Sequence, residues 1–199
     1  MKITSSYISL TELTFNDIEL IRKWRNTIGI RQHMDFQEEI TPKMQEKWFE
    51  KLDPSINFFF IIHFNKIPIG LIQLQDINWE SKIASSGLYI GDQRYQGSPL
   101  AYMASLPILD LGFNVLGLES ITAKVSKRNK KALQYNRSLG FIIDKELNER
   151  FVLMSHSKEQ FKTAIEKHES FQKLFKSYSL TDTNRYIDLS IHKSWFFLP

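Results

Sequence analysis

The sequence lacks cysteine, and it also lacks any long hydrophobic run. The absence of cysteine excludes disulfide bridges, thiolate metal sites and thiol nucleophiles, and it is consistent with a reducing compartment. The longest apolar run covers residues 58–62, which is far short of a bilayer-spanning helix and is typical of a buried strand. The first residues contain no hydrophobic segment of the kind that directs export. We therefore expect a cytoplasmic protein with no membrane partner.

The composition indicates a globular domain with a substantial core. Of the 199 residues, 42% are hydrophobic and 13% are aromatic. This length slightly exceeds that of one usual domain, so we expect a domain over residues 1–156 and a helical or irregular extension over residues 157–199. The extension is expected to pack against the domain or a second subunit, because it carries the aromatic residues Phe161, Phe171, Phe175, Trp195, Phe196 and Phe197.

Charge indicates little about partners. The net charge of +4 is small enough to come from scattered surface lysine and arginine, so we expect no nucleic-acid partner.

Hydrophobic periodicity predicts a mixed α/β fold. Strands are expected at residues 7–10, 57–64, 67–74, 82–91, 120–125, 141–145 and 150–154. Helices are expected at residues 17–26, 42–52, 99–113 and 129–139. Asn16 with Glu19 has the form of a capping box, and Asn65-Lys66 that of a tight hairpin turn. Pro107 is expected to kink or break its helix.

A glycine-containing loop connects the predicted strand 82–91 to the predicted helix 99–113. Free backbone amides and the positive end of the helix dipole converge at such a loop, which suits it to bind phosphate. Arg94, Gly97 and Ser98 occupy this place, with Ser98 as the predicted N-cap. The loop alone does not decide the matter, because strand-to-helix turns often contain glycine only for its backbone freedom.

The loop is one half of a longer pattern. Residues 87–91, followed by Arg-Tyr-Gln-Gly-Ser-Pro at 94–99, resemble the coenzyme-binding motif Gln/Arg-x-x-Gly-x-Gly/Ala of GNAT acetyltransferases. Asn129 and Ala132, followed by Leu-Gly-Phe at 139–141, resemble the downstream Asn-x-x-Ala helix of that superfamily. The resemblance covers roughly residues 7–154. It implies a mostly antiparallel sheet flanked by helices, in which parallel strands at 83–90 and 120–125 splay apart.

The resemblance also implies acetyl-CoA as acyl donor and no metal. Pantetheine would bond to the backbone freed by the splayed strands, pyrophosphate would lie on the loop, and Asn129 would bond to pantetheine or to neighbouring backbone. The implied coenzyme-binding residues are Leu88, Tyr89, Ile90, Arg94, Tyr95, Gln96, Gly97, Ser98, Asn129 and Ala132. Five nearby cations either meet the 3′-phosphate or form a solvated face: Lys124, Lys127, Arg128, Lys130 and Lys131. Pro99 stands where relatives have glycine or alanine, so one amide that could bind phosphate is missing.

The catalytic acid stays open. Many GNAT enzymes place a tyrosine seven residues after the motif asparagine to protonate the thiolate, and here that position is Asn136, with Tyr135 one residue earlier. Tyr135 is a candidate acid if the helix is locally rotated, and otherwise a tyrosine packed on the sheet. A thiol with a pKa near ~8.5 leaves readily, so the acid matters less than the base. Strand-edge amides at residues 88–90 could stabilise the oxyanion.

The catalytic base is open as well. An alkyl ammonium has a pKa near ~10, so a base must remove a proton at neutral pH. In one branch of the superfamily a glutamate precedes the strand glycine by two positions, and here that residue is Ser85. Asp76, or water held by Ser85 or Ser86, could replace it. His33 and His63 are alternatives, although a lone histidine is more often structural.

The first third of the chain bears on the acceptor. The Trp24-Arg25-Asn26 triplet resembles the first third of one branch of the superfamily. That branch contains ribosomal-protein N-terminal acetyltransferases, spermidine acetyltransferases and enzymes that acetylate nucleotide-linked 4-amino sugars. Together with Gly87-Leu88-Tyr89, the triplet is most like the amino-sugar group. The implied substrate-binding residues are Trp24, Arg25, Asn26 and Tyr89. Trp24 or Tyr89 would stack on a base or sugar, and Arg25 or Arg31 would bind a diphosphate. The alternative for Trp24 is an anchor in the core.

We therefore predict an acetyl-CoA-dependent N-acetyltransferase that acts on the primary amine of a small molecule, preferentially a nucleotide-linked amino sugar. The alternatives are a peptide N-terminal or polyamine acetyltransferase, or a noncatalytic CoA-binding or regulatory module on the same fold. A homodimer is left open.

Overall fold

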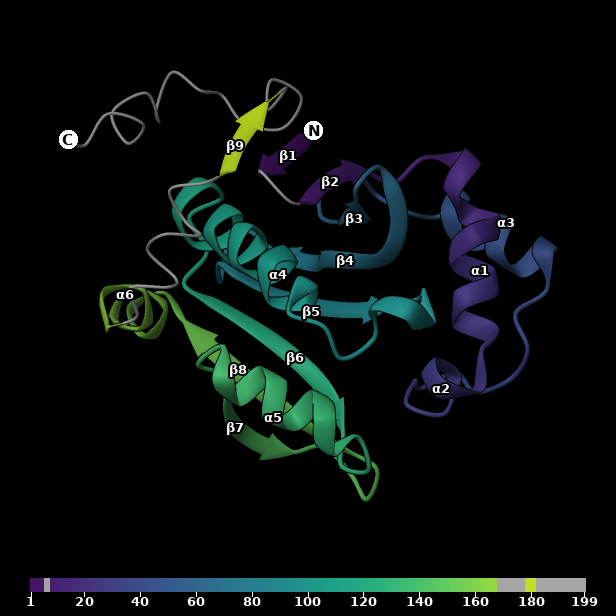
Figure 1. Ribbon diagram of the computed structural model, residues 1–199. Helices are drawn as coiled ribbons and strands as arrows, with labels where there is room; N and C mark the ends of the chain where they lie inside the picture. Colours follow the sequence, from purple (N-terminus) through teal and green to yellow (C-terminus); the bar gives the residue numbers. More distant parts are fainter. Residues whose placement is uncertain (6–7, 168–177, 182–199) are drawn as a thin grey trace.

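The computed structural model describes residues 1–5, 8–167 and 178–181. In this part nine strands form one sheet in the order β7-β8-β6-β5-β4-β3-β2-β1-β9. They are β1 Lys2–Ser5, β2 Ile8–Glu12, β3 Phe58–Phe64, β4 Ile67–Asn78, β5 Ile83–Ile90, β6 Ser120–Ser126, β7 Ile142–Glu146, β8 Phe151–Ser157 and β9 Tyr178–Thr181. Neighbours are antiparallel except β5 and β6, which run parallel (Figure 1). The predicted fold class is confirmed.

Helices cover both faces of the sheet (Figure 1). They are η1 Phe15–Asp17, α1 Ile18–Asn26, α2 Ile28–Arg31, α3 Pro42–Glu50, η2 Gln93–Tyr95, α4 Leu100–Asp110, η3 Leu111–Val115, α5 Lys130–Ser138 and α6 Lys158–Lys167. Phe58, Phe60 and Ile62 of β3 pack in the core under α4, whereas Phe59 and Ile61 pack in a second core with α1 and α3. Because β3 is buried on both faces, its sequence is apolar without alternation.

Two expected turns have the backbone that their residues favour. Asn65 and Lys66 both have positive φ, at 49° and 65°, as a two-residue hairpin requires. Gly140 follows α5 with a φ of +101°, the left-handed conformation expected after a helix.

The predicted capping box is wrong by two residues. Thr14 and Asp17 form it, because the chain enters α1 through the extra turn η1. The Thr14 amide and hydroxyl donate to Asp17 Oδ2 at 2.9 and 2.7 Å. Glu19 instead bonds with Arg22 at 2.6 Å.

Two expectations for the helix after β5 are also corrected. Pro99 occupies the N-cap position of α4, whereas the Ser98 hydroxyl donates to the Tyr95 carbonyl at 2.6 Å. Of the two outcomes expected at Pro107, a kink or a break, the break does not occur, since α4 continues to Asp110. The helix widens into a π-turn only at η3.

Additional elements lie at the ends of the described chain. β1 and β9 were not predicted, and they pair with each other at one edge of the sheet. Phe161 of α6 is buried, with its ring 5.2 Å from that of Phe113. The other aromatic residues of the extension, at positions 171, 175 and 195–197, lie outside the described residues, and the domain boundary at 157 stays a prediction. None of the helices in the described ranges has the length and hydropathy of a membrane-crossing segment.

Candidate active site

The parallel strands β5 and β6 pair over three residues and then separate. Their register ends at Ser85 opposite Thr122, although β5 continues to Ile90 and β6 to Ser126 (Figure 1). Two side chains close the paired part: the Thr122 hydroxyl donates to the Ala84 carbonyl at 3.1 Å, and the Ser86 hydroxyl donates to the Thr122 carbonyl at 3.2 Å. We call the region beyond them, between residues 86–90 and 123–126, the strand opening. The separation of β5 from β6 confirms the prediction that these two parallel strands splay apart.

One edge of β5 faces the strand opening. The Gly91 amide donates to the carbonyl of Ile69 in β4 at 2.8 Å, and the Ile90 carbonyl accepts from the Gln96 side chain at 3.0 Å. Because backbone groups alternate in direction along a strand, the Leu88 amide points to the same edge as Ile90, away from β4. Leu88 and Ile90 are therefore the residues of the predicted set whose amides face the strand opening, whereas the main chain of Tyr89 pairs with Leu71 of β4.

The predicted phosphate loop lies between β5 and α4. Gln96 ties it to the end of β5, and Gly97 has a φ of +77°. A Cβ at Gly97 would have no atom within 4 Å, so the space beside this backbone is open. Tyr95 packs edge-on against Phe64, with ring centroids 5.5 Å apart.

Arg94 is held by an acidic neighbour inside this loop. Its guanidinium pairs with the Asp92 carboxylate at 2.7 Å, and Asp92 also accepts from the Arg94 amide at 3.0 Å. The hydrogen bond from Arg94 lowers the pKa of Asp92. A phosphate on this loop would therefore have to share Arg94 with Asp92.

The motif residues on α5 are engaged with the helix itself. Asn129 caps α5, because its side-chain oxygen accepts from the Ala132 amide at 3.0 Å. This contact matches the neighbouring-backbone alternative stated for Asn129. The Asn136 side chain donates to the Ala132 carbonyl at 2.9 Å.

Tyr135 is half-buried between α4 and α5. Its hydroxyl donates to the Ala101 carbonyl at 3.0 Å and lies 2.5 Å from the Ser105 hydroxyl. Burial raises the pKa of Tyr135. These contacts favour the packed alternative for Tyr135 over proton donation to a thiolate.

The five predicted cations divide into two groups. Lys124 pairs with Asp35 at 2.5 Å, and Lys127 pairs with Glu146 at 2.6 Å. The other three form no ion pair within the part of the chain that the structure describes: Arg128, Lys130 and Lys131. Since α5 begins at Lys130, two of them lie at the positive end of a helix, a placement that costs free energy unless an anion is near.

A pocket of about 290 Å³ lies under α1 and α3, on the face of the sheet opposite the one that α4 and α5 cover. We call it the acceptor pocket. It is lined by Ile21, Arg25, Phe36, Ile40, Met44, Gln45, Trp48, Phe59, Leu71, Gln73, Gln75 and Tyr89. Tyr89 belongs to the part of β5 that pairs with β4 but not with β6, so the pocket adjoins the strand opening. Among the described residues that line the pocket, Arg25 is the charged one.

Two polar atoms of the acceptor pocket are buried without a partner among the described residues. They are Arg25 Nε and the Tyr89 hydroxyl. Burial raises the pKa of Tyr89, and the nearby positive charge of Arg25 partly offsets this. Because a buried polar atom without a hydrogen bond is costly, these two atoms are candidates to contact a ligand.

The other two residues of the Trp24-Arg25-Asn26 triplet support the pocket. Trp24 is 8% exposed and lies against Tyr89, with ring centroids 6.5 Å apart, which favours the core-anchor alternative. Asn26 donates to the Ile40 carbonyl at 2.9 Å and accepts from the Ile40 amide at 2.8 Å. Asn26 thus folds the segment before α3 onto α1, and Arg25 alone of the triplet lines the pocket.

The candidate bases lie at different places. Asp76 is on a bulge of β4 with a φ of 53°, and its amide donates to Asn57 at 3.1 Å. Ser85 lies opposite Gln75 at the paired end of β5. His63 is on β3 opposite Ser9, and neither His63 nor His33 lines the acceptor pocket.

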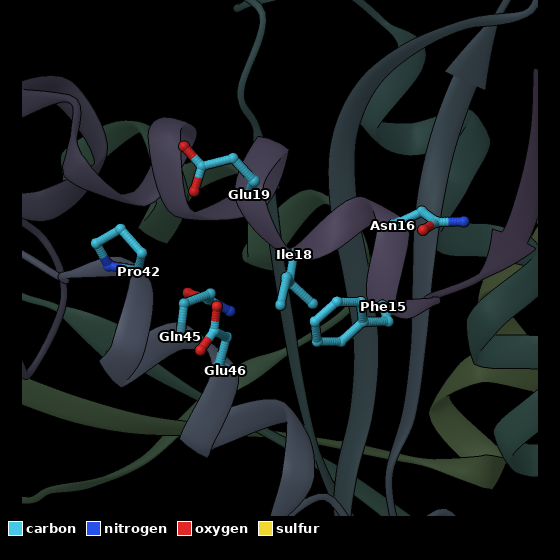
Figure 2. Close-up of a pocket in the computed structure, with 7 residues that line it drawn as sticks. All are labelled: Phe15, Asn16, Ile18, Glu19, Pro42, Gln45 and Glu46. Atoms are coloured by element: carbon cyan, nitrogen blue, oxygen red, sulfur yellow. The ribbon is translucent and has the colours of Figure 1, made fainter.

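A second hollow of about 260 Å³, the outer pocket, lies where α1 and α3 begin. Figure 2 shows Glu19 on one side of it and Gln45 and Glu46 on the other. Glu19 is neutralised there by Arg22, whose Nε donates to it at 2.6 Å. Gln45, which is buried, lines both pockets.

Sequence reasoning missed most of the acceptor pocket. Gln73 and Gln75 are two residues apart on β4 and so lie on the same face of the sheet. Nothing in their residue type indicates that this face carries a pocket. Phe36 and Ile40 come from the irregular segment after α2.

A family model described as acetyltransferase (GNAT) domain matches residues 8–142. The chain is 25% identical over 164 residues to spermidine N(1)-acetyltransferase of Escherichia coli, covering 81% of this chain and 87% of that protein. It is 32% identical over 142 residues to acetyltransferase PseH of Campylobacter jejuni, covering 68% of this chain and 83% of that protein.

The fold is similar to that of spermidine N-acetyltransferase from Vibrio cholerae, solved in complex with CoA and spermine. The TM-score is 0.71 at 21% identity, over 79% of this chain and 99% of that one.

Proposed function

The chain belongs to the GNAT acetyltransferase family, and from this membership we propose that it transfers the acetyl group of acetyl-CoA to the primary amine of a small molecule, preferentially an amino sugar linked to a nucleotide. The observation that carries the acceptor assignment is the charge of the acceptor pocket. Among the described residues that line the pocket, Arg25 is charged and none is a carboxylate. A guanidinium attracts the phosphates of a nucleotide and repels a polyamine, which carries several positive charges.

Features on the other side of β5 support a coenzyme site. The Leu88 amide points to the strand opening, Gly97 leaves open space beside its backbone, and Lys130 lies at the start of α5. These are the groups that would hold pantetheine, pyrophosphate and the 3′-phosphate. When bound, acetyl-CoA supplies the thioester that the amine attacks.

The chain's own residues suggest how the reaction is assisted. The Leu88 amide is the donor proposed to stabilise the oxyanion, because it is not used by a neighbouring strand. Tyr135 already donates its hydroxyl proton to Ala101, so we propose that the thiolate leaves without a strong acid. Holding the amine beside the thioester can replace much of that assistance, since orientation contributes several kcal/mol in favourable cases.

CoA is expected to raise the melting temperature, and Gly97→Val to abolish this shift. Binding to the folded state alone stabilises it by about 2.7 kcal/mol at one hundred times the Kd. A valine side chain would fill the open space beside Gly97 where pyrophosphate approaches the backbone. Differential scanning fluorimetry with and without CoA measures both effects.

Gly117→Val is the matched control for this experiment. Gly117 has a φ of +70° and no atom within 4 Å of its added Cβ, so it imposes the same backbone strain elsewhere. The control should keep the CoA-induced shift. An unaltered chain that shows no shift at millimolar CoA would speak against the coenzyme site.

We expect UDP-linked 4-amino sugars to be acetylated at least about tenfold faster, in kcat/KM, than spermidine or amino-terminal peptides. Arg25→Gln should lower kcat/KM for the sugar nucleotide by roughly tenfold or more, because a charged hydrogen bond contributes about 1.5–3 kcal/mol. The KM for acetyl-CoA should not change. Release of free thiol from acetyl-CoA follows each reaction.

The outcomes separate the alternatives. Turnover of spermidine or peptide without sugar turnover would replace the acceptor and keep the enzyme class. CoA binding without turnover of any amine would favour the noncatalytic module.

A further inference from the structure

Three polar side chains at the end of β4 form a hydrogen-bonded chain that leads into the acceptor pocket. Gln73 Nε2 donates to Gln75 Oε1 at 2.7 Å, and Gln75 Nε2 donates to Asp76 Oδ2 at 2.9 Å. Gln73 and Gln75 line the pocket, whereas Asp76 is exposed and is not among the residues that line it. The chain therefore runs from the surface to the pocket interior.

The carboxylate sets the direction of both amides. A carboxylate accepts hydrogen bonds only, so Gln75 must turn its NH₂ group toward Asp76. Gln75 then presents its carbonyl oxygen to Gln73, which must turn its own NH₂ group toward Gln75. The Gln73 carbonyl oxygen is left at the far end of the amide, away from Gln75. Asp76 can act in this way because the β4 bulge holds it at a φ of 53°, with its amide bonded to Asn57.

Gln73 lies at the boundary between the acceptor pocket and the strand opening. Its partner across the sheet is Gly87, two residues beyond the last paired residue of β5, Ser85. A Cβ at Gly87 would lie 3.1 Å from Gln73 Nε2, so the NH₂ end of the amide lies over β5 in the space that the missing side chain leaves. The carbonyl is the other end of this amide, and Gln73 lines the acceptor pocket.

We propose that the Gln73 side-chain carbonyl accepts a hydrogen bond from the acceptor's amine and orients it, and that Asp76 and Gln75 are positioning residues that hold this carbonyl toward the amine. This inference rests on the proposed function. It assigns Asp76 the role of orienting an amide rather than that of the general base. A carbonyl acceptor suits a primary amine, which carries N–H donors, and leaves the nitrogen lone pair available for attack.

The first test is Gln73→Met. Methionine has a similar length and no strong acceptor, so the KM for a UDP-linked 4-amino sugar should rise about tenfold while the KM for acetyl-CoA stays unchanged. If Gln73 merely packs, methionine should leave the amine KM within about twofold of that of the unaltered chain, and that result would overturn the role.

The second test is Asp76→Asn, which asparagine's tolerance of left-handed backbone makes compatible with the fold. Asparagine can donate as well as accept, so the amide chain loses its single direction. We expect a two- to fivefold rise in the amine KM with kcat nearly unchanged, since the loss of one neutral hydrogen bond costs about 1 kcal/mol. A fall in kcat of about one hundredfold or more with an unchanged KM is the signature of a lost base and would overturn the positioning role.

Calorimetric binding of the same sugar nucleotide separates this inference from the proposed function. Binding that Gln73→Met weakens about tenfold supports the role of Gln73. Binding that is indifferent to both variants overturns that role alone. No binding by the unaltered chain, together with turnover of another amine, overturns the acceptor assignment and this role with it.

Discussion

Replacing Gly91 with alanine is expected to lower the free energy of unfolding by about 3 kcal/mol. A Cβ at Gly91 would lie 2.1 Å from the Trp24 ring. Neither group can move cheaply: Trp24 is buried against Tyr89, and the Gly91 amide is bonded to the Ile69 carbonyl at 2.8 Å. The methyl group must therefore push α1 away from the end of β5. Urea denaturation at neutral pH measures the loss.

Gly29→Ala is the matched control. Gly29 lies in α2, and a Cβ there would meet no atom within 4 Å, so we expect stability to change by less than about 1 kcal/mol, in the stabilising direction. Because Arg25 follows Trp24 on α1, the Gly91 variant should also lose affinity for the acceptor while keeping that for CoA. Equal denaturation midpoints for the two variants would show that Trp24 does not anchor α1 against Gly91.

The arrangement of the proposed coenzyme site could be predicted because it is local in sequence. A strand, a glycine loop and a helix follow one another over residues 82–113, so their order alone places Gly97 and Ser98 between β5 and α4. The same holds for Asn129, whose side chain caps the helix that it begins. Such features depend on neighbours a few residues away, and these are visible in the sequence.

The acceptor half could not be predicted in the same way. Helical spacing placed Trp24 and Arg25 on α1, but it cannot tell which of two adjacent residues is buried in the core and which lines a pocket. For Gln73 and Gln75, period-two alternation shows only that they share a face of β4. Whether that face is hollow depends on α1 and α3, and the link to Asp76 depends on a bulge that has no sequence signal.

A buried histidine outside both sites gives a further strong effect. His156 on β8 is fully buried among the rings of Phe141, Phe113 and Phe161, at 5.0, 5.6 and 6.0 Å. Neither ring nitrogen has a hydrogen bond of normal geometry among the described residues. Desolvation lowers the pKa of His156 to about 4, an effect that weak hydrogen bonding to the Gln160 side chain and the Gly140 backbone partly offsets.

This environment predicts a loss of stability in mild acid that His156→Phe should remove. Well above pH 6.5, His156 is neutral in both the folded and the unfolded chain, so its titration does not lower the free energy of unfolding there. As the pH falls from about 6.5 to about 4, the unfolded chain binds a proton that the folded chain cannot, so the free energy of unfolding decreases by about 3 kcal/mol in total and by about 2 kcal/mol at pH 5. Phenylalanine does not titrate, and it leaves no buried ring nitrogen without a partner.

Urea denaturation of both proteins at pH 7 and pH 5 isolates the contribution of His156, because the carboxylates that also titrate are common to the two proteins. The unaltered chain should lose about 2 kcal/mol more than the variant, and equal losses would mean that His156 takes up its proton within the folded chain.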